Sequence, residues 1–239
     1  MENVLAWGLV IAFAGGLIRG TTGFGASMVM TPPLALLFGP KVAVPVALLL
    51  ETFAAAPMLP AALAVARWRT IAPIGAAAVI AVPLGGYFLI ASDPLILRKV
   101  IALTVIVFSL ALLSGRRYQG VQRLPTTLAL GALSGTMLGA TSVGAPPVIL
   151  YLLSGPDPVA VTRANLTLYV IVISAAGLIM LSVSGLMTAS TLQTAALLAL
   201  PFATGVLAGS RLFAKFSEQH YRQFAITFMF LVSLGVLFA

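Results

Sequence analysis

Uninterrupted apolar runs of helical length constrain this chain more than any other feature of its sequence. They include residues 100–113, 164–183 and 226–239, and the polar and apolar alternation of barrel strands is absent from the sequence. In a bilayer every backbone N–H and C=O must find a partner inside the protein, which only helices and closed barrels achieve. Because 61% of the 239 residues are hydrophobic and 8% are charged, polar surface cannot cover a soluble domain. We therefore predict an all-α polytopic membrane protein embedded in a lipid bilayer.

The remaining composition excludes several functional classes. With no cysteine there is no disulfide, thiolate metal site or thiol redox chemistry. The net charge of +8 comes from basic residues spread through short loops between apolar segments, where they set orientation, so no nucleic-acid partner is expected. The motifs GxxxxGK[ST], HExxH, GxSxG and CxxC do not occur. We expect neither an enzyme nor a bound metal or cofactor.

One unusual segment, rich in glycine and hydroxyl residues and containing a Pro-Pro pair, occurs twice in the sequence. "GLIRGTTGFGASMVMTPPLALLFGP" begins at Gly16 and "GALSGTMLGATSVGAPPVILYLLSGP" begins at Gly131. The alignment pairs Gly20 with Gly135 and both Pro-Pro and Gly-Pro pairs, and "LGGYFLIASDPLILRKVIAL" (84–103) later parallels "LAGSRLFAKFSEQHYRQFAI" (207–226). The chain therefore reads as a duplication, with a first repeat at 1–115, a basic cytoplasmic linker at 116–124 and a second repeat at 125–239.

Each repeat contains a glycine-broken pair of short apolar segments followed by three longer ones. The predicted segments are 4–18, 23–39, 42–65, 70–91 and 96–114 in the first repeat, and 125–138, 141–154, 158–183, 189–210 and 221–238 in the second. The broken pair either crosses the membrane once as a kinked helix, or goes down and back as a hairpin. Roughly 35 residues rise about 50 Å, less than two crossings of a core near 30 Å, so paired segments must be short or re-entrant.

The distribution of basic residues favours the hairpin. With inverted repeats of five segments each, nine basic residues lie inside and three outside, whereas four plus four spans give five inside and seven outside. The nine are Arg67, Arg69, Arg116, Arg117, Arg123, Arg163, Arg211, Lys215 and Arg222, and the three are Lys41, Arg98 and Lys99. We predict the inverted 5+5 arrangement with broken first helices and keep eight spans, 4+4, as the alternative.

Broken helices at corresponding places in inverted halves are typical of the midplane site of a secondary transporter. Converging half-helix N-termini offer unpaired N–H donors and partial positive charge, which suit an anion. Glycines permit close approach of the backbone, and hydroxyls add donors. The candidate substrate-binding residues at the breaks are Gly20, Thr21, Thr22, Gly23, Gly25, Gly135, Thr136, Thr141, Ser142 and Gly144. The alternative is that these small residues only let helices pack closely.

Charged and polar residues inside the apolar segments add to the candidates, because each charge costs a few kcal/mol at the bilayer centre. Arg19 would bind the anion, or would neutralise carbonyls at a helix end. Glu51 would carry a coupling proton, or would pair with Arg19. Arg163 and Asn165 would bind substrate, although Arg163 could equally extend to lipid headgroups. Tyr169 falls close to the position that Glu51 holds in the first repeat.

The duplicated segments, extended to "GLIRGTTGFGASMVMTPPLALLFGPKVAV" and "GALSGTMLGATSVGAPPVILYLLSGPDPVAV", and the following "RWRTIAPIGAAAVIAVPLGGYFL" resemble the TauE/SafE sulfite exporter family over nearly the whole chain. The resemblance implies a transporter of the bacterial or archaeal inner membrane that exports small sulfur-containing anions such as sulfite or organosulfonates. Many relatives have a longer glycine run where this chain has Thr21–Gly25. Carboxylates remain open as substrates, and an anion channel, an intramembrane enzyme and an assembly subunit are the rival functions.

Overall fold

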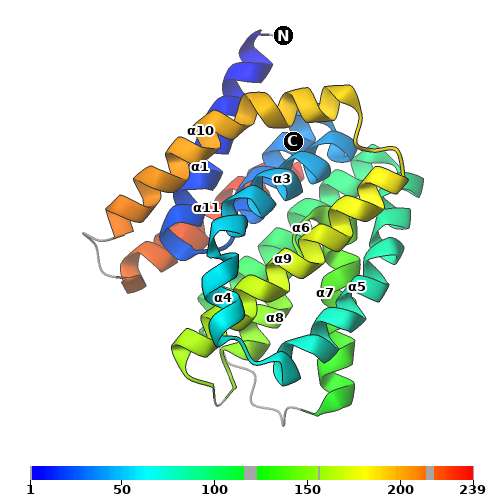
Figure 1. The fold of residues 1–239 in the computed structure, drawn as a ribbon. Helices are drawn as coiled ribbons and strands as arrows, with labels where there is room; N and C mark the ends of the chain where they lie inside the picture. Colours follow the sequence, from blue (N-terminus) through cyan, green and yellow to red (C-terminus); the bar gives the residue numbers. More distant parts are fainter. Residues whose placement is uncertain (1, 116–122, 156, 214–217, 239) are drawn as a thin grey trace.

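The computed structural model of the protein describes residues 2–115, 123–155, 157–213 and 218–238, and all regular structure within these ranges is helical (Figure 1). The helices are α1 (Glu2–Thr22), α2 (Ala26–Phe38), α3 (Pro40–Ala55), α4 (Leu59–Val65), α5 (Trp68–Ala91), α6 (Pro94–Leu113), α7 (Leu124–Thr141), α8 (Ala145–Leu152), α9 (Val159–Val183), α10 (Ala189–Phe213) and α11 (Glu218–Phe238). A 3-10 turn at Ala56–Met58 separates α3 from α4. The predicted segment 42–65 is therefore bent, because Pro57 and Pro60 lack the N–H that a straight helix needs.

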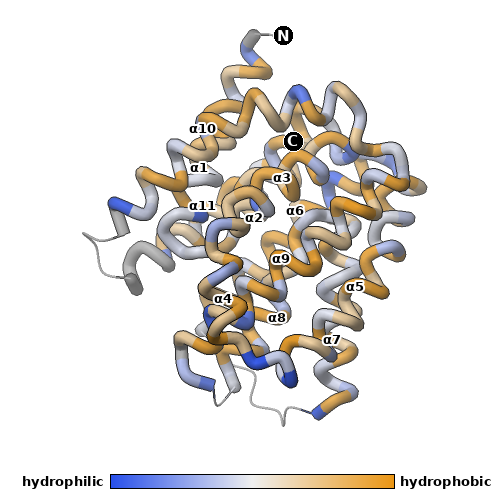
Figure 2. The backbone as a smooth tube through the Cα atoms, in the orientation of Figure 1, coloured by the Kyte–Doolittle hydropathy of each residue, from blue (hydrophilic) through white to orange (hydrophobic). Residues whose placement is uncertain are grey.

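The prediction of an all-α membrane protein is confirmed. Among the described residues, six helical stretches are long and apolar enough to cross a membrane. They are Asn3–Thr22, Pro40–Val65, Trp68–Ala91, Pro94–Leu113, Ala160–Val183 and Ala189–Arg211. Figure 2 shows mainly hydrophobic helices, with hydrophilic positions gathered toward their ends and at the loop between α4 and α5. Most of the predicted linker, residues 116–122, and Lys215 lie outside the described residues.

Each glycine-broken pair reverses direction and forms an antiparallel hairpin. Phe38, near the end of α2, packs against Gly8 of α1, and Met30 packs against Gly15. In the second pair, the Tyr151 hydroxyl of α8 lies 2.6 Å from the Thr127 hydroxyl at the start of α7. The two halves of each pair are unequal: α2 has 13 residues and α8 has 8, too few to span a hydrocarbon core. A single kinked crossing is therefore not what the chain forms.

The break in the first hairpin lies later than the sequence predicts. Helix α1 continues through Arg19, Gly20 and Thr21 to Thr22, and the chain turns at Gly23 and Gly25, whose φ angles are 77° and 85°. These positive φ angles favour glycine. The predicted end of the first segment at residue 18 is four residues too early, because a glycine in a closely packed helix does not end it.

Small residues bring helices of the two predicted repeats into backbone contact. Gly16 and Gly20 of α1 face the carbonyls of Phe202 and Val206 of α10. On the other side of the molecule, Gly135 of α7 faces the Ala78 carbonyl of α5, and further such contacts come from Gly85, Gly139, Gly205 and Gly209. The packing interpretation is confirmed for Gly20 and Gly135. In the alignment α1 corresponds to α7 and α10 to α5. The α1–α10 contact and the α7–α5 contact are therefore equivalent pairings with the two repeats exchanged.

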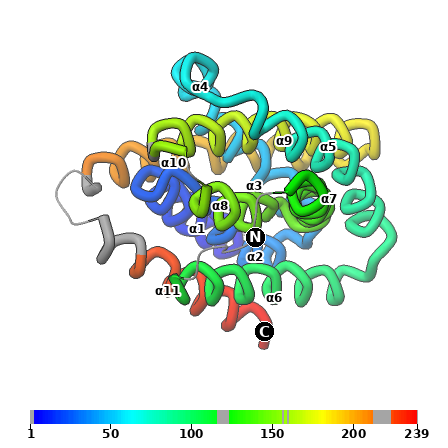
Figure 3. The backbone as a smooth tube through the Cα atoms, turned by 90° about the horizontal axis from the view of Figure 1, so that it is seen from below, coloured from blue at the N-terminus to red at the C-terminus, as the bar shows by residue number. Residues whose placement is uncertain are grey.

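The remaining helices enclose the two hairpins. Figure 3 shows α6 and α11, which contact each other, along one edge, and α9 and α10 along the opposite edge, with α2, α3 and α8 between. Polar ties hold both ends of α5: Arg67, just before it, pairs with Asp157, and the Lys41 ammonium donates to the Ile90 carbonyl at 2.8 Å. Arg67 and Lys41 thus lie at opposite ends of a 24-residue helix, about 36 Å long.

The glycine contacts predict the cost of adding a single methyl group. In Gly135→Ala the new Cβ would lie 2.7 Å from the Ala78 carbonyl carbon, so backbone must move. We expect a loss of about 1–3 kcal/mol in stability, measured by thermal unfolding in detergent. Gly75→Ala, in α5, is the matched control because nothing lies within 4 Å of its added Cβ. Equal melting temperatures for the two variants would contradict the close contact between α5 and α7.

Candidate functional site

A small cavity lies where α2 and α8 begin. Its lining includes Gly25 and Ser27 from the start of α2, Ala145 from the start of α8, Ser142 from the second break, Glu51 of α3 and Ser174 of α9. The cavity has room for about one water molecule. The beginnings of both short helices thus line one space, as the sequence predicts.

The two helix N-termini do not contribute equally to this cavity. The first N–H groups of an α-helix have no partner within the helix and carry partial positive charge. Helix α2 presents three such groups, on Ala26, Ser27 and Met28, and no side chain caps it. Helix α8 has Pro146 and Pro147 in its first turn, and proline has no N–H. Most of the backbone donors at the cavity therefore come from α2.

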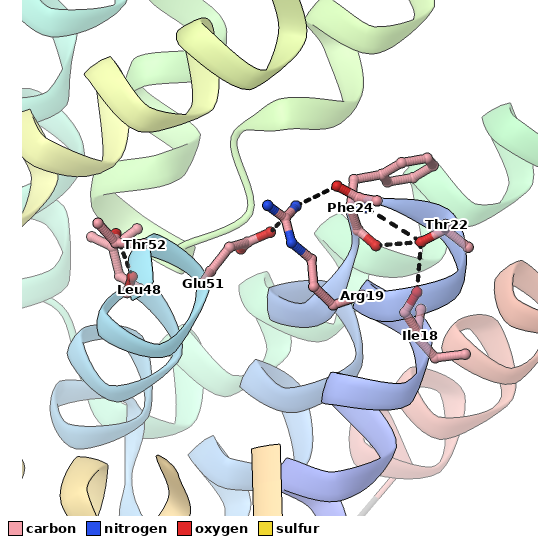
Figure 4. Close-up of polar contacts among 8 residues, drawn as sticks. Ile18, Arg19, Thr22, Phe24, Leu48, Glu51 and Thr52 are labelled. Atoms are coloured by element: carbon pink, nitrogen blue, oxygen red, sulfur yellow. Dashed lines mark hydrogen bonds and ion pairs between the residues drawn. The ribbon is translucent and has the colours of Figure 1, made fainter. Parts of the chain in front are cut away.

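Arg19 and Glu51 form a buried ion pair beside the cavity (Figure 4). The Arg19 Nη1 lies 3.7 Å from the Glu51 Oε1 and donates a 2.5 Å hydrogen bond to the Gly23 carbonyl, and both residues are 6% exposed. Glu51 lines the cavity, whereas Arg19 is not among the lining residues. The structure therefore shows both alternative roles, since Arg19 neutralises a carbonyl at the end of α1 and Glu51 pairs with it.

The hydroxyls predicted from the sequence are engaged elsewhere. Each donates to a backbone carbonyl of its own segment: Thr21 to Leu17 or Ile18, Thr22 to Ile18 or Phe24, Thr141 to Met137, and Ser142 to Thr141. Ser142 also accepts from Thr31 of α2 at 2.7 Å, since its own proton is used. A hydroxyl has one proton to donate, so these four offer none to an anion in this conformation.

Ser142 also makes the turn of the second break. It has a φ of 59° and is the one non-glycine residue with positive φ among those described. This conformation costs an ordinary residue roughly 1–2 kcal/mol. Its bonds to Thr31 and Thr141 hold it there, so Ser142 joins the first hairpin to the second break.

Other predicted candidates do not line the cavity. Gly20 and Gly135 pack against neighbouring helices, Gly23 is exposed in the turn, and Gly144 accepts a hydrogen bond from Ser134. Thr136 is not a lining residue. Arg163 is exposed, and the Asn165 side-chain oxygen accepts from the Arg67 N–H at 2.8 Å. Arg163 and Asn165 thus lie near the Arg67–Asp157 end of α9, away from Ser174.

The second break has a neutral version of the Arg19–Glu51 arrangement. Tyr169 donates to Ser134 at 2.6 Å, and Ser134 donates to the Gly144 carbonyl. Pairing Gly20 with Gly135 aligns Ser134 with Arg19, and Tyr169 lies near the aligned position of Glu51. In each break, therefore, a side chain of the first helix binds a carbonyl in the turn and a residue of the next long helix.

Sequence reasoning missed Ser27, Ser134 and Ser174. Ser134 could have been found by reading across the alignment from Arg19. Ser27 follows the turn glycine Gly25 by two residues, which places it in the first turn of α2. Ser174 had no signal beyond being a hydroxyl within an apolar run, and only the fold brings it to the cavity.

Comparison with known proteins identifies the family of the chain. The family model described as Sulfite exporter TauE/SafE matches residues 8–236. Neither the curated proteins nor the solved structures include a match to this chain.

The buried pair predicts that single and double substitutions differ. Arg19→Ala leaves the Glu51 carboxylate buried without its cation, and we expect a loss of about 3–5 kcal/mol in stability. Arg19→Ala/Glu51→Ala removes both charges and should cost less than the sum of the two single variants. Thermal unfolding of Arg19→Ala, Glu51→Ala and the double variant in detergent measures this coupling. Ser134→Ala, which removes an uncharged side chain at the aligned position, is the comparison. Strict additivity would show that the two charges do not interact.

Proposed function

The chain belongs to the sulfite exporter TauE/SafE family, whose members are membrane transporters and not enzymes, and we propose that it exports small sulfur-containing anions such as sulfite or organosulfonates by alternating access. It is a multi-pass membrane protein, and we place it in a bacterial or archaeal inner membrane. Two inverted repeats, 1–115 and 125–239, would supply the moving parts. Arg67 and Lys41 lie at opposite ends of α5, as both the 5+5 and the 4+4 arrangements require. The antiparallel hairpins α1–α2 and α7–α8 support the inverted 5+5 arrangement.

The observation that carries the proposal is the cavity at the starts of α2 and α8 with Glu51 in its wall. Helix N-termini favour an anion without placing a full positive charge in the membrane. The Arg19–Glu51 pair leaves the site with little net charge when empty. A site of this kind binds a small anion yet does not bind it so tightly that release becomes slow. The cavity must widen to admit an anion larger than water, as alternating access requires.

Glu51 would couple the anion to a proton. A carboxylate and an anion about 4 Å apart repel by roughly 4 kcal/mol at an effective dielectric constant of 20. Protonation of Glu51 removes this repulsion and leaves the positive charge of Arg19 unopposed near the site. Proton and anion would therefore bind together, and export would follow the outward concentration gradient of the anion.

The first test is ligand binding by purified protein in detergent. We expect sulfite, isethionate, taurine or sulfoacetate to raise the melting temperature. A ligand at a concentration of 100 times its Kd adds about 2.7 kcal/mol to the free energy of unfolding. Simple carboxylates and chloride at matched ionic strength are the comparisons. Saturable flux of the stabilising anion into proteoliposomes would complete the case. Stabilisation by carboxylates alone would favour the alternative substrate class, and conductance without saturation would favour a channel.

Glu51→Gln tests the proton. The amide keeps the shape of the side chain but cannot ionise, so anion affinity should become independent of pH. In the unmodified protein, anion binding should be accompanied by proton uptake, so affinity should fall as pH rises. Kd measured by thermal shift from pH 5 to pH 8 gives both profiles. A persistent slope in Glu51→Gln would assign the pH dependence to another group.

A further inference from the structure

We propose that Ser27 and Ser174 are the side chains that bind the oxygens of the transported oxyanion. This inference rests on the proposed function and specifies its site. The two serines come from α2 and α9, and both line the cavity. Neither serine was among the substrate-binding residues predicted from the sequence.

The first argument is that both residues are buried and line the cavity, while their hydroxyls have no hydrogen-bond partner within the described protein. Ser27 is 5% exposed and Ser174 is 1% exposed. A serine inside a helix commonly bonds the carbonyl four residues before it, as Ser154 does with Leu150. None of the hydrogen bonds among the described residues involves the Ser27 or Ser174 hydroxyl. Hydroxyls inside a protein are nearly always satisfied, so two unpartnered hydroxyls that line one cavity point to a water or a ligand bound there.

The second argument is the balance of donors and acceptors around the cavity. An anion accepts hydrogen bonds, so it needs donors whose protons are not already used. The Ser142 proton is used by the Thr141 carbonyl, while Glu51 presents acceptor oxygens. The protons that remain are those of Ser27, Ser174 and the first-turn amides of α2, to which Ser27 itself belongs. These donors lie on two different helices, so they can reach separate oxygens of one ligand.

The chemical class follows from this arrangement. Sulfite and sulfonates present three oxygens on one centre, and separate donors can each bind one. A halide also accepts several hydrogen bonds, but on a single centre, so donors spaced to reach separate oxygens fit it less well. We therefore infer selectivity for oxyanions over chloride, produced by neutral donors. Charge on the ligand is matched by Arg19 only once Glu51 is protonated.

Serine-to-alanine variants test the assignment. Ser27→Ala and Ser174→Ala should each raise the Kd for sulfite by about 10-fold or more, because a hydrogen bond to a charged group is lost. Ser174→Thr keeps the hydroxyl and should restore most of the affinity. The pH dependence of binding should remain in all three, since Glu51 is intact; a merely structural effect would not separate alanine from threonine in this way.

Ser109→Ala is the matched control. The Ser109 hydroxyl of α6 is buried without a hydrogen-bond partner, and Ser109 does not line the cavity, so its removal should leave Kd unchanged. Thermal unfolding without ligand verifies that each variant is folded. If the unmodified protein binds sulfite and both alanine variants bind it equally well, this assignment is wrong while the proposed function stands. If the unmodified protein binds and transports no sulfur oxyanion, both are wrong.

Discussion

The absence of water in the hydrocarbon core is the constraint on which this structure depends. A helix that breaks there leaves carbonyls and amides that lipid cannot satisfy. In the first break Arg19 binds the Gly23 carbonyl and Thr22 binds the Phe24 carbonyl, and in the second Ser134 binds the Gly144 carbonyl. The glycines and hydroxyls that make the duplicated segments unusual are thus explained first by the backbone. Ser27, Met28 and Ser174, which line the cavity, contribute donors without a partner in the described protein: two first-turn amides of α2 and two hydroxyls.

The two breaks solve the same problem with different chemistry. In the first break the turn carbonyl is bound by a charged residue, Arg19, which pairs with Glu51. In the second it is bound by a neutral residue, Ser134, which accepts a hydrogen bond from Tyr169. A charged pair in the membrane is costly and is retained where charge has a use, whereas a serine and a tyrosine achieve the same bonding more cheaply. The asymmetry therefore places the buried ion pair at the break of the first repeat and a neutral hydrogen-bonded pair at the break of the second. The second repeat contributes a fixed counterpart, with α8 supplying few donors because of its prolines.

The sequence predicts the helices of this protein well and its site less well. Apolar runs located the segments to within a few residues, because a membrane helix is recognisable from composition alone. The end of α1 was misplaced because Gly20 looks like a helix breaker until Val206 is known to lie against it. Thr21, Thr22, Thr141 and Ser142 have the right chemistry for an anion site, but hydrogen-bond direction decides whether a hydroxyl is available, and sequence carries no such information. Ser174 is distant in sequence from every break, so only tertiary structure reveals it.

The glycine contacts also limit how the protein can move. Where Gly16 and Gly20 meet the carbonyls of α10, and Gly135 meets α5, no side chain lies between the backbones, and close-packed surfaces of this kind resist sliding. The pairs α1–α10 and α5–α7 therefore behave as units, each combining helices of both predicted repeats. The proposed alternating access would then separate one unit from the other around the cavity. The Thr31–Ser142 hydrogen bond joins the hairpin of one unit to the break of the other, so it is the contact that opening would have to break. Its loss would free the Thr31 proton and allow the strained backbone of Ser142 to relax.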